Sequence, residues 1–472
     1  MANQVDYRDP TPNNFPQDYD PSKVDSRVKL RSESIKHKQK GEHTREAMYQ
    51  ALEIGSVTAN EAKSTALDTA SRQDAVEQSQ KDFEGRYNDQ VAGNTDLDET
   101  IDLREDSAHN IFKTAKERVD NIEKTFDYQP QIELAENVDL SIKKNLLQYK
   151  TSLNQSAVKL LLVQDLHYSK RSNMDDDYDQ AAPRTLDHLK AMELIADDLD
   201  GAIINGDSAH GNEPKGITTI RNKQIITTAK GVLGDTPLLM TVGNHDDNSV
   251  FLKTTDQRLD LAELESIYGK TYSYHDYKDQ KLRVILLSGF ENPEVYGDDG
   301  LTKYPRASSS VFTQEQLNWL ANDALIVPAG YHVIIFNHSP LQGFFGNLPY
   351  PTMNCVNHDV LMNILMAFVN GSSMMLSVGN TDFPISMNVD FSKQGKGTLV
   401  GCIFGHEHRD VATVQEVNGI RGVERTCNIG VGSNRVVGEL SEYAFDVVEV
   451  DTTAKHVKLN RFGAGNSLEF DY

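Results

Sequence analysis

The segment GTLVGCIFGHEH (residues 397–408) is an apolar run that ends in a glycine followed by two histidines, His406 and His408, with one residue between them. Side chains at positions i and i+2 of a β-strand lie on the same face of the sheet. We therefore expect both imidazoles to lie on one side of a strand end. Such a pair is either part of a metal site or an accident of the sequence, and the choice depends on what the other strands supply.

Four other apolar runs end in residues of the types that bind metal ions. Their terminal residues are Asp165 and His167, Asp207, Asn244 and His245, and His338. In open α/β sheets, ligands bind beyond the carboxyl ends of the strands, so we expect these side chains to converge. Each motif alone has a simpler explanation, because a single histidine is usually structural and Gly-Asp or Asn-His pairs usually mark turns. Five such strand ends in one chain nevertheless predict a metal site.

Extended and helical patterns alternate along the same part of the chain. Continuous apolar runs predict buried strands, and amphipathic patterns predict helices. The predicted strands cover 157–165, 200–207, 236–247, 281–289, 331–340 and 397–408, the predicted helices cover 186–199 and 313–325, and two further strands lie within 444–463. This alternation, followed by strands alone, is typical of a layered α/β sandwich.

The order of the motifs resembles that of the calcineurin-like metallophosphoesterases. In that family D-x-H, GD, GNH with an acidic residue, a strand-end histidine and GH-x-H follow one another, and here the matching stretches are DLH (165–167), GD (206–207), GNHD (243–246), His338 and GHEH (405–408). The resemblance covers roughly residues 156–463. It implies a four-layer α/β/β/α metallophosphoesterase sandwich with a metal-dependent phosphoesterase activity. We expect an N-terminal α-helical, coiled-coil-like region to precede this sandwich.

The resemblance also implies a site for two divalent metal ions. Carried over residue by residue, Asp165, His167 and His408 bind one ion, Asn244, His338 and His406 bind the other, and Asp207 bridges the two. In the family, the histidine that corresponds to His245 is not a ligand and faces the substrate phosphate as the catalytic residue. Carboxylate, amide and imidazole ligands without thiolate favour Mn, Fe or Zn in such a site over a structural zinc site.

One position departs from the family pattern. Many members have an aspartate three residues after the Gly-Asp aspartate, where it orients the catalytic histidine, whereas GDSAHG has His210 there. We expect Asp246 to orient His245 instead, as a second catalytic residue, and His210 to bind the substrate phosphate together with Asn244 and His245. Gly211 stands where protein phosphatases typically have arginine, which disfavours a phosphoprotein substrate.

Composition narrows the range of partners. The chain has 472 residues and a net charge of −23, which repels polyphosphate backbones and argues against a nucleic-acid partner. Its three cysteines form no C-x-x-C pair. The polar N-terminus does not look like a signal peptide, and no apolar run is long enough to span a membrane, so we expect synthesis in the cytoplasm.

The first 130 residues differ in composition from the rest. Residues 1–43 begin with four prolines in the first 30 positions, which predicts an extended arm. Residues 44–82 have helical spacing and predict an oligomerising helix, with a disordered linker as the alternative. The thin stripe that carries this prediction consists of Met48, Leu52, Gly55, Ala59, Ala62 and Ala66. Residues 110–125 predict a second helix, 131–155 a linker, and 464–472 a C-terminal tail.

A second resemblance concerns the N-terminal part alone. The stretch RYNDQVAGNTDLDETIDLREDS (86–107) resembles a segment of tail and baseplate proteins of phages of lactic acid bacteria, and the likeness extends over about residues 25–125. It implies that residues 44–130 form a helical region for oligomerisation and virion attachment. It also implies a homotrimer that binds other phage tail or baseplate proteins, and a protein that is made in the host cytoplasm and placed in the virion tail.

Together these features predict a phage tail-associated phosphoesterase. We expect its substrate to be a phosphate ester, specifically a phosphodiester of a host cell-surface polymer such as teichoic acid. One alternative is a virion structural or receptor-binding protein that binds but does not cleave such a polymer, and the complete ligand set argues against it. Another alternative is a nuclease-type phosphodiesterase, against which the acidic charge argues.

Overall fold

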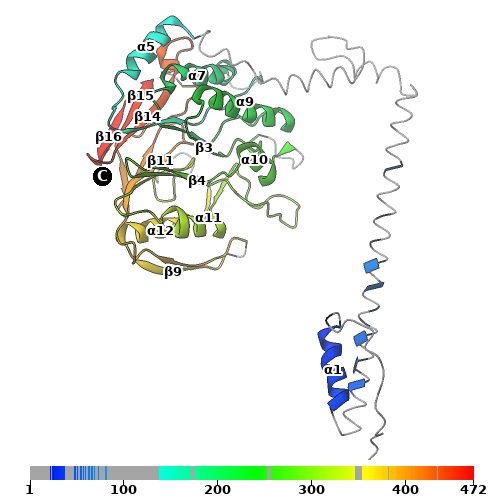
Figure 1. The fold of residues 1–472 in the computed structure, drawn as a ribbon. Coiled ribbons are helices and arrows are strands. Elements are labelled where there is room, and N and C mark those ends of the chain that lie inside the picture. The colour runs from blue at the N-terminus through cyan, green and yellow to red at the C-terminus, as the bar shows by residue number, and fades with distance from the viewer. Residues whose placement is uncertain are drawn as a thin grey trace, which may run out of the picture. The chain divides into compact units, whose positions relative to one another are not determined.

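The computed structural model describes residues 138–472, apart from 172–175, 252–256, 346–352, 381 and 433, together with 22, 24–37 and scattered residues between 47 and 81. The chain divides into two compact units, Met1–Tyr128 and Gln129–Tyr472 (Figure 1). The predictions for residues 86–107 and 110–125 lie outside the described residues.

The larger unit is built on two sheets. Within its described residues, one six-stranded sheet has the order β16-β15-β14-β1-β2-β3 and a second has the order β12-β13-β11-β7-β5-β4. The first consists of β1 (Val158–Val163), β2 (Gly201–Asn205), β3 (Leu238–Thr241), β14 (Ala444–Asp451), β15 (His456–Gly463) and β16 (Leu468–Asp471). The second consists of β4 (Ser273–Tyr277), β5 (Leu282–Leu286), β7 (His332–Phe336), β11 (Thr398–Phe404), β12 (Gln415–Val417) and β13 (Ile420–Glu424).

The centre of each sheet is parallel. Strand β2 runs parallel to β1 and to β3 in the first sheet, and β7 runs parallel to β5 and β11 in the second. The carboxyl ends of parallel strands lie at one edge of a sheet, which is where ligands bind in folds of this class. The loops after β1, β2 and β3 therefore leave from one edge of the first sheet, and the loops after β7 and β11 leave from one edge of the second.

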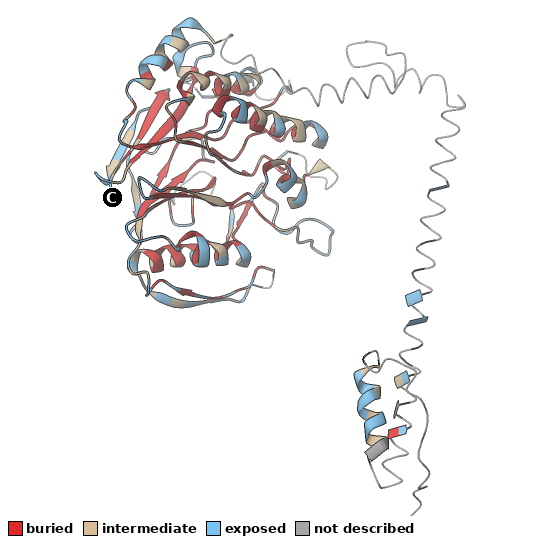
Figure 2. Cartoon of the chain, in the orientation of Figure 1, coloured by how far each residue is buried: buried red, intermediate tan, exposed pale blue. Residues whose placement is uncertain are grey.

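Alternate residues of the central strands face two different cores. Leu160 and Leu162 of β1 pack into a core between the two sheets, which they share with residues of β5, β7 and β11. Leu161 points the opposite way, into the core under the first layer of helices. Ile335 of β7 and Phe404 of β11 pack into the core under the second layer. The order of layers is therefore helix, sheet, sheet, helix, with the strands buried on both faces (Figure 2).

Helices cover the outer face of each sheet. On the first sheet lie α5 (Leu140–Lys150), α7 (Thr185–Ala191), α8 (Glu193–Ala196) and α9 (Lys215–Leu233). On the second lie α11 (Gln314–Trp319) and α12 (His358–Asn370), beside a hairpin of β9 (Ser373–Val378) and β10 (Ile385–Asp390). The unit also contains shorter elements, among them α6 (Asp176–Ala181), α10 (Leu261–Tyr268), β6 (Ser309–Val311) and β8 (Asn354–Val356). The prediction of a mixed α/β fold is confirmed.

Two boundaries differ from the predicted ones. Helix α5 falls in the segment 131–155, which was expected to be a linker, yet its Leu146 is fully buried and the Tyr149 hydroxyl donates to the carbonyl oxygen of Asn460 at 2.5 Å. Its apolar side chains have the helical spacing that a helix needs to pack on a sheet. At the other end, β16 pairs with β15, so residues 468–471 belong to the sheet and not to a separate tail.

The smaller unit contains helix α1 (Ser26–His37), in a stretch that was expected to be an extended arm. The four prolines all precede it, and the Asp25 carboxylate accepts a hydrogen bond from the Arg27 amide at the first turn. The described residues between 47 and 81 are helical. Arg31 of α1 donates to the Gln50 side chain at 3.1 Å, so α1 lies beside the start of that helical stretch. Among the described residues, no helix is long and apolar enough to cross a membrane.

The packing of α5 generates a matched pair of substitutions. Leu146→Ala removes a fully buried side chain and should lower the free energy of unfolding by about 2–5 kcal/mol. Leu147→Ala changes the neighbouring residue, which is 51% exposed, and should alter it by no more than about 0.5 kcal/mol. Thermal unfolding of the two variants beside the parent protein measures the difference. Equal melting temperatures for the two variants would show that α5 does not pack on the sheet.

Candidate metal centre

Two groups of side chains meet at the shared edge of the sheets. In the first, which we call cluster A, Asp165 and His167 follow β1 and His408 follows β11. The His408 Nε2 atom lies 3.5 Å from Oδ1 of Asp165 and 2.8 Å from Nε2 of His167. Their ligand atoms lie within 4.8 Å of one another, which is close enough for one ion to bind all three.

The second group, cluster B, contains Asp207 after β2, His338 after β7 and His406 after β11. The His338 Nε2 atom lies 3.2 Å from Oδ2 of Asp207. Asn244, which follows β3, joins this cluster because its Oδ1 lies 2.8 Å from Nδ1 of His406. His406 and His408 thus belong to different clusters.

Asp207 and Asp165 lie between the two clusters. Oδ2 of Asp207 faces His338 of cluster B at 3.2 Å and His167 of cluster A at 3.7 Å. Oδ1 of Asp165 faces His408 of cluster A at 3.5 Å and His338 at 3.8 Å. Carboxylate oxygens therefore lie between the two clusters, and Oδ2 of Asp207 is close to a histidine of each.

The backbone at this edge is held in an unusual conformation. Eleven described non-glycine residues have positive φ, and five of them are in the clusters, with φ between 48° and 77°: Asp165, His167, Asp207, His406 and His408. This region disfavours residues with a side chain, and such strain gathers at functional sites. The finding also corrects the expectation for His406 and His408, because both lie in the loop after β11 and not on one face of a strand.

Gly243 of the GNHD motif lies too close to Asp207 for a residue with a side chain to replace it. A Cβ atom on Gly243 would lie 2.1 Å from Oδ1 of Asp207, so any side chain here would displace the carboxylate. The same Oδ1 accepts a hydrogen bond from the His245 amide at 2.8 Å. The turn after β3 therefore fixes one oxygen of Asp207 and leaves the other to face the clusters.

Among the described residues, no lysine or arginine neutralises the negative charge of the clusters. Asp165 and Asp207 are at most 1% exposed, and in the described part of the chain their only ion-pair partners are histidines. Asp446, a buried carboxylate elsewhere in the fold, is instead paired with both Arg425 and Arg461 at 2.9 Å. Burying two carboxylates without a permanently charged partner is costly, so cations at the clusters would supply the missing positive charge.

The residues fit divalent metal ions on a second count. Nδ1 of His338 donates to the backbone carbonyl of Asn205 at 2.6 Å, so in the neutral ring the lone pair is on Nε2. This Nε2 is fully buried and, within the described residues, has no hydrogen-bond partner of good geometry. Ligands about 2.1 Å from a tetrahedral ion lie roughly 3.4 Å apart, close to the 3.2–3.8 Å between carboxylate and imidazole atoms here. The donor set is oxygen and nitrogen, which suits Mn, Fe or Zn.

Protonation of the cluster B histidines follows from the same charges. Although burial lowers it, the pKa of His338 is raised to about 9 by the carboxylates of Asp207 and Asp165. Burial, followed by the nearby His338, lowers the pKa of His406 to about 3. One histidine thus holds a proton between carboxylates and the other is neutral. A metal ion binds only neutral imidazole, so binding of an ion at cluster B would release the His338 proton.

The rings of His167, His210 and His245 form a third group of close nitrogen atoms. It is not a third metal site, because a neutral imidazole has one lone pair and His167 directs Nε2 toward cluster A. The Nδ1 atom of His245 lies 2.8 Å from the backbone carbonyl oxygen of His210 and donates to it. This bond leaves Nε2 of His245 for another partner.

Asp246 does not orient His245 as expected. Its two oxygens accept hydrogen bonds from the backbone amides of Asp207, Ala209 and Gly243 at 2.8–3.1 Å. All three donors belong to the two turns that carry the motifs. Asp246 therefore ties the loop after β2 to the loop after β3, and the carbonyl oxygen of His210 takes over the orientation of His245.

Three residues that hold the motif loops in place were not predicted: Gln164, Asn205 and Asn337. Asn205 donates from Nδ2 to Oε1 of Gln164 and to the carbonyl oxygen of Asn337, and its own carbonyl accepts from His338. All three side chains are buried. Each comes directly before a motif, at residues 165, 206 and 338. A polar residue at the end of an apolar strand was the signal, because it has no place in a purely apolar core.

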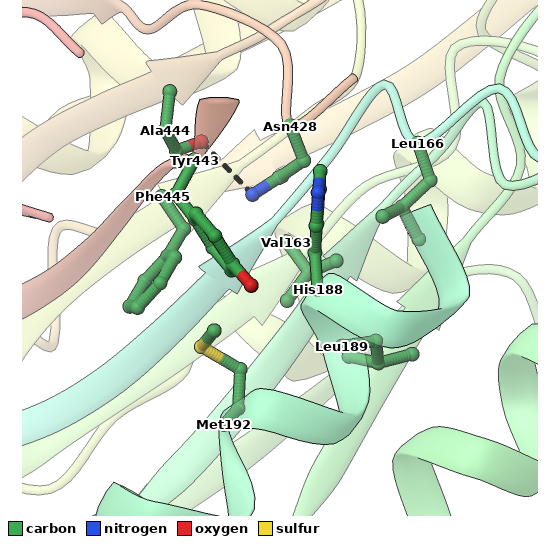
Figure 3. A pocket seen from close by; sticks show the side chains of 9 residues that line it. All are labelled: Val163, Leu166, His188, Leu189, Met192, Asn428, Tyr443, Ala444 and Phe445. Atoms are coloured by element: carbon green, nitrogen blue, oxygen red, sulfur yellow. Dashed lines mark hydrogen bonds between the residues drawn. The ribbon is translucent and has the colours of Figure 1, made fainter. Parts of the chain in front are cut away.

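A small cavity of about 10 Å³ lies apart from the clusters, between β1, α7 and the start of β14. Its lining is mainly apolar and includes Leu166, Met192 and Phe445, with His188 and Asn428 as polar neighbours (Figure 3). None of the cluster residues lines it. A space of this size holds at most one water molecule, so it is not a substrate site.

No family model matches the sequence, and no curated protein matches it. Solved structures with a similar fold include a dimetal phosphatase from Danio rerio, at 12% identity and a TM-score of 0.45 over 67% of this chain and 99% of that one. Another is the purple acid phosphatase PPD1 from yellow lupin (Lupinus luteus) seeds, at 13% identity and a TM-score of 0.38 over 68% of this chain and 55% of that one. A third is Vacuolar Protein Sorting 29 from Cryptosporidium parvum, at 10% identity and a TM-score of 0.26 over 67% of this chain and 99% of that one. With such TM-scores these likenesses decide neither the activity nor the substrate.

The separation of the two histidines into different clusters is testable by metal content. After loading with Mn²⁺ or Zn²⁺ and dialysis, the parent protein should retain two ions per chain. His406→Ala and His408→Ala should each retain one, because each removes a ligand of one cluster only. Elemental analysis of the dialysed proteins gives the count. Loss of both ions from either single variant, or two ions in both, would contradict the assignment.

Proposed function

We propose that the chain is a binuclear metal-dependent phosphoesterase in which clusters A and B each hold one divalent cation. The observation that carries the proposal is the position of Oδ2 of Asp207, within 3.2 Å of His338 and 3.7 Å of His167. A carboxylate placed in this way could serve a cation in each cluster. We assign Asp165, His167 and His408 to one ion, Asn244, His338 and His406 to the other, and Asp207 to both.

When bound, two divalent cations generate a nucleophile from water at neutral pH and neutralise the charge that develops on the phosphoryl group. The protein side chains supply the rest. In its doubly protonated form, His245 keeps the bond from Nδ1 to the His210 carbonyl and offers the Nε2 proton to the leaving oxygen. Asp246 contributes by holding the backbone of both motif loops in place.

A protein that only binds phosphorylated polymer is the second candidate. Its phosphate could be held by one cation or by basic side chains, so two complete sets of ligands and the oriented His245 favour catalysis. A nuclease is a third candidate. The net charge of −23 disfavours it, because nucleic-acid binding gains most of its affinity from basic residues that neutralise phosphates.

We further propose that the substrate is a phosphodiester of a host surface polymer such as teichoic acid, and that the protein is carried on a phage tail as a homotrimer. The proposed host-surface substrate follows from the resemblance of residues 86–107 to phage tail proteins. The helical stripe of the smaller unit supports the proposed homotrimer. Its described members are exposed in the single chain: Met48, Gly55, Ala59, Ala62 and Ala66. Such a stripe becomes buried when copies of a helix pack together.

Hydrolysis assays test the proposed activity directly. The full-length protein should cleave bis-p-nitrophenyl phosphate faster than p-nitrophenyl phosphate, with Mn²⁺, Zn²⁺, Mg²⁺ or Ca²⁺ supplied in turn, and chelation should abolish turnover. No turnover of either ester with any of the four metals, in protein shown to contain two ions, would leave the binding protein as the better account.

Substitution of His245 separates catalysis from metal binding. His245→Asn should lower kcat by at least about 10², because proton transfer to the leaving group is lost in the transition state. Both ions should remain, since His245 belongs to neither cluster. The variant is assayed at saturating metal, with metal content measured on the same sample. Undiminished kcat would remove His245 from the mechanism.

The oligomeric state tests the role of the N-terminal region. Light scattering should give the mass of a trimer for the full-length protein and of a monomer for residues 129–472, which form a compact unit of their own. The fragment must keep its activity for the comparison to hold. A monomeric full-length protein would contradict the trimer and weaken the placement on a phage tail.

A further inference from the structure

His210 occupies a buried position between two functional histidines. It follows β2 by five residues and is 6% exposed. Its ring is stacked 5.4 Å from the ring of His245 and lies 5.2 Å from that of His167. It was expected to bind phosphate, but its contacts are with the protein on both sides.

The side chain of His210 contacts the metal ligand of cluster A. Its Nδ1 lies 3.2 Å from Nδ1 of His167, and Nε2 of His167 faces His408 and Asp207. A ligand histidine that binds through Nε2 carries its proton on Nδ1. That proton needs an acceptor, and the lone pair on Nδ1 of His210 is in place to accept it. Such contacts behind a metal ligand fix its tautomer and the direction of its ring.

The backbone of His210 contacts the histidine proposed to face the substrate. Its carbonyl oxygen accepts the Nδ1 proton of His245 at 2.8 Å. Close approach of the two loops is possible because Gly211 follows: a Cβ atom there would lie 2.2 Å from the carbonyl oxygen of His245. The backbone contact does not depend on which side chain residue 210 carries.

The segment around His210 is anchored on several sides. Its amide donates to the carbonyl oxygen of Tyr168 at 3.2 Å, and the Ala209 amide donates to Asp246 at 3.0 Å. The rings of Tyr178 and Phe251 lie 5.0 and 4.8 Å from its own ring. Residue 210 therefore has little freedom to move when its side chain changes, which separates the roles of its ring and of its backbone.

We propose that His210 is a positioning residue with two outputs: its ring accepts the proton of His167 and fixes that residue as a ligand of cluster A, and its backbone carbonyl orients His245. This rests on the proposed two-metal function and replaces the expected contact with phosphate. The carboxylate that many related enzymes have at this position is thus replaced by an imidazole that serves a metal ligand. The two outputs are separable, because only the first depends on the identity of the side chain.

The test compares three substitutions in the full-length protein. His210→Asn keeps an acceptor oxygen near the place of Nδ1, His210→Gln moves it one carbon farther, and His210→Leu removes it. Calorimetric titration of the metal-free proteins with Mn²⁺ should show one of the two sites weakened about 10–100-fold in the Leu and Gln variants. The other site should be unchanged, and His210→Asn should bind both ions within about threefold of the parent protein.

Kinetics supply the second readout. With both sites saturated by Mn²⁺, the Leu variant should recover most of the parental kcat, because the carbonyl contact to His245 remains. Equal Mn²⁺ affinity in the parent and Leu proteins would overturn the proposal, as would equal weakening of both sites in all three variants, which is the result of a merely structural role. If the Leu variant does not fold, the difference between Asn and Gln decides. A parent protein that binds no Mn²⁺ would instead refute the two-metal function itself.

Discussion

The interaction on which the site depends is the burial of Asp165 and Asp207 beside histidines alone. Elsewhere the fold neutralises a buried carboxylate with arginine, as it does for Asp446 between Arg425 and Arg461. At the clusters the described residues supply no such partner, and one imidazole nitrogen, Nε2 of His338, is left without a hydrogen bond. Bound cations would resolve both deficits together: they would balance the carboxylates, and one of them would replace the Nε2 proton of His338 and take its lone pair.

The arrangement of the sheets makes this concentration of charge possible. Parallel strands end at one edge, so five loops deliver their ligands to one place. The loops are then tied to one another: Asp246 joins the turn after β2 to the turn after β3, and Asn205 joins the ends of β1, β2 and β7. Five residues of the clusters have positive φ, so the strained backbone of this edge lies at the ligands themselves.

Much of this could be predicted from the sequence, because the apolar strands and the residues that end them are local features. The mixed α/β fold and the grouping of ligand types at strand ends were predicted in this way. Contacts over long distances were not. Nothing in GNHDD indicates that Asp246 bonds to backbone amides of another loop, or that the carbonyl of His210 orients His245. Helix α5 was missed because its three buried residues, Ile142, Leu146 and Tyr149, lie in an otherwise polar stretch.

The central claim is that the carboxylates at the strand ends hold two cations with Asp207 between them. Anomalous X-ray diffraction from crystals of the protein loaded with Mn²⁺ or Zn²⁺ tests it most directly. The account predicts two anomalous peaks, one beside Asp165, His167 and His408 and one beside Asn244, His338 and His406, with an oxygen of Asp207 touching both. A single peak, or two peaks of which neither touches Asp207, would contradict it.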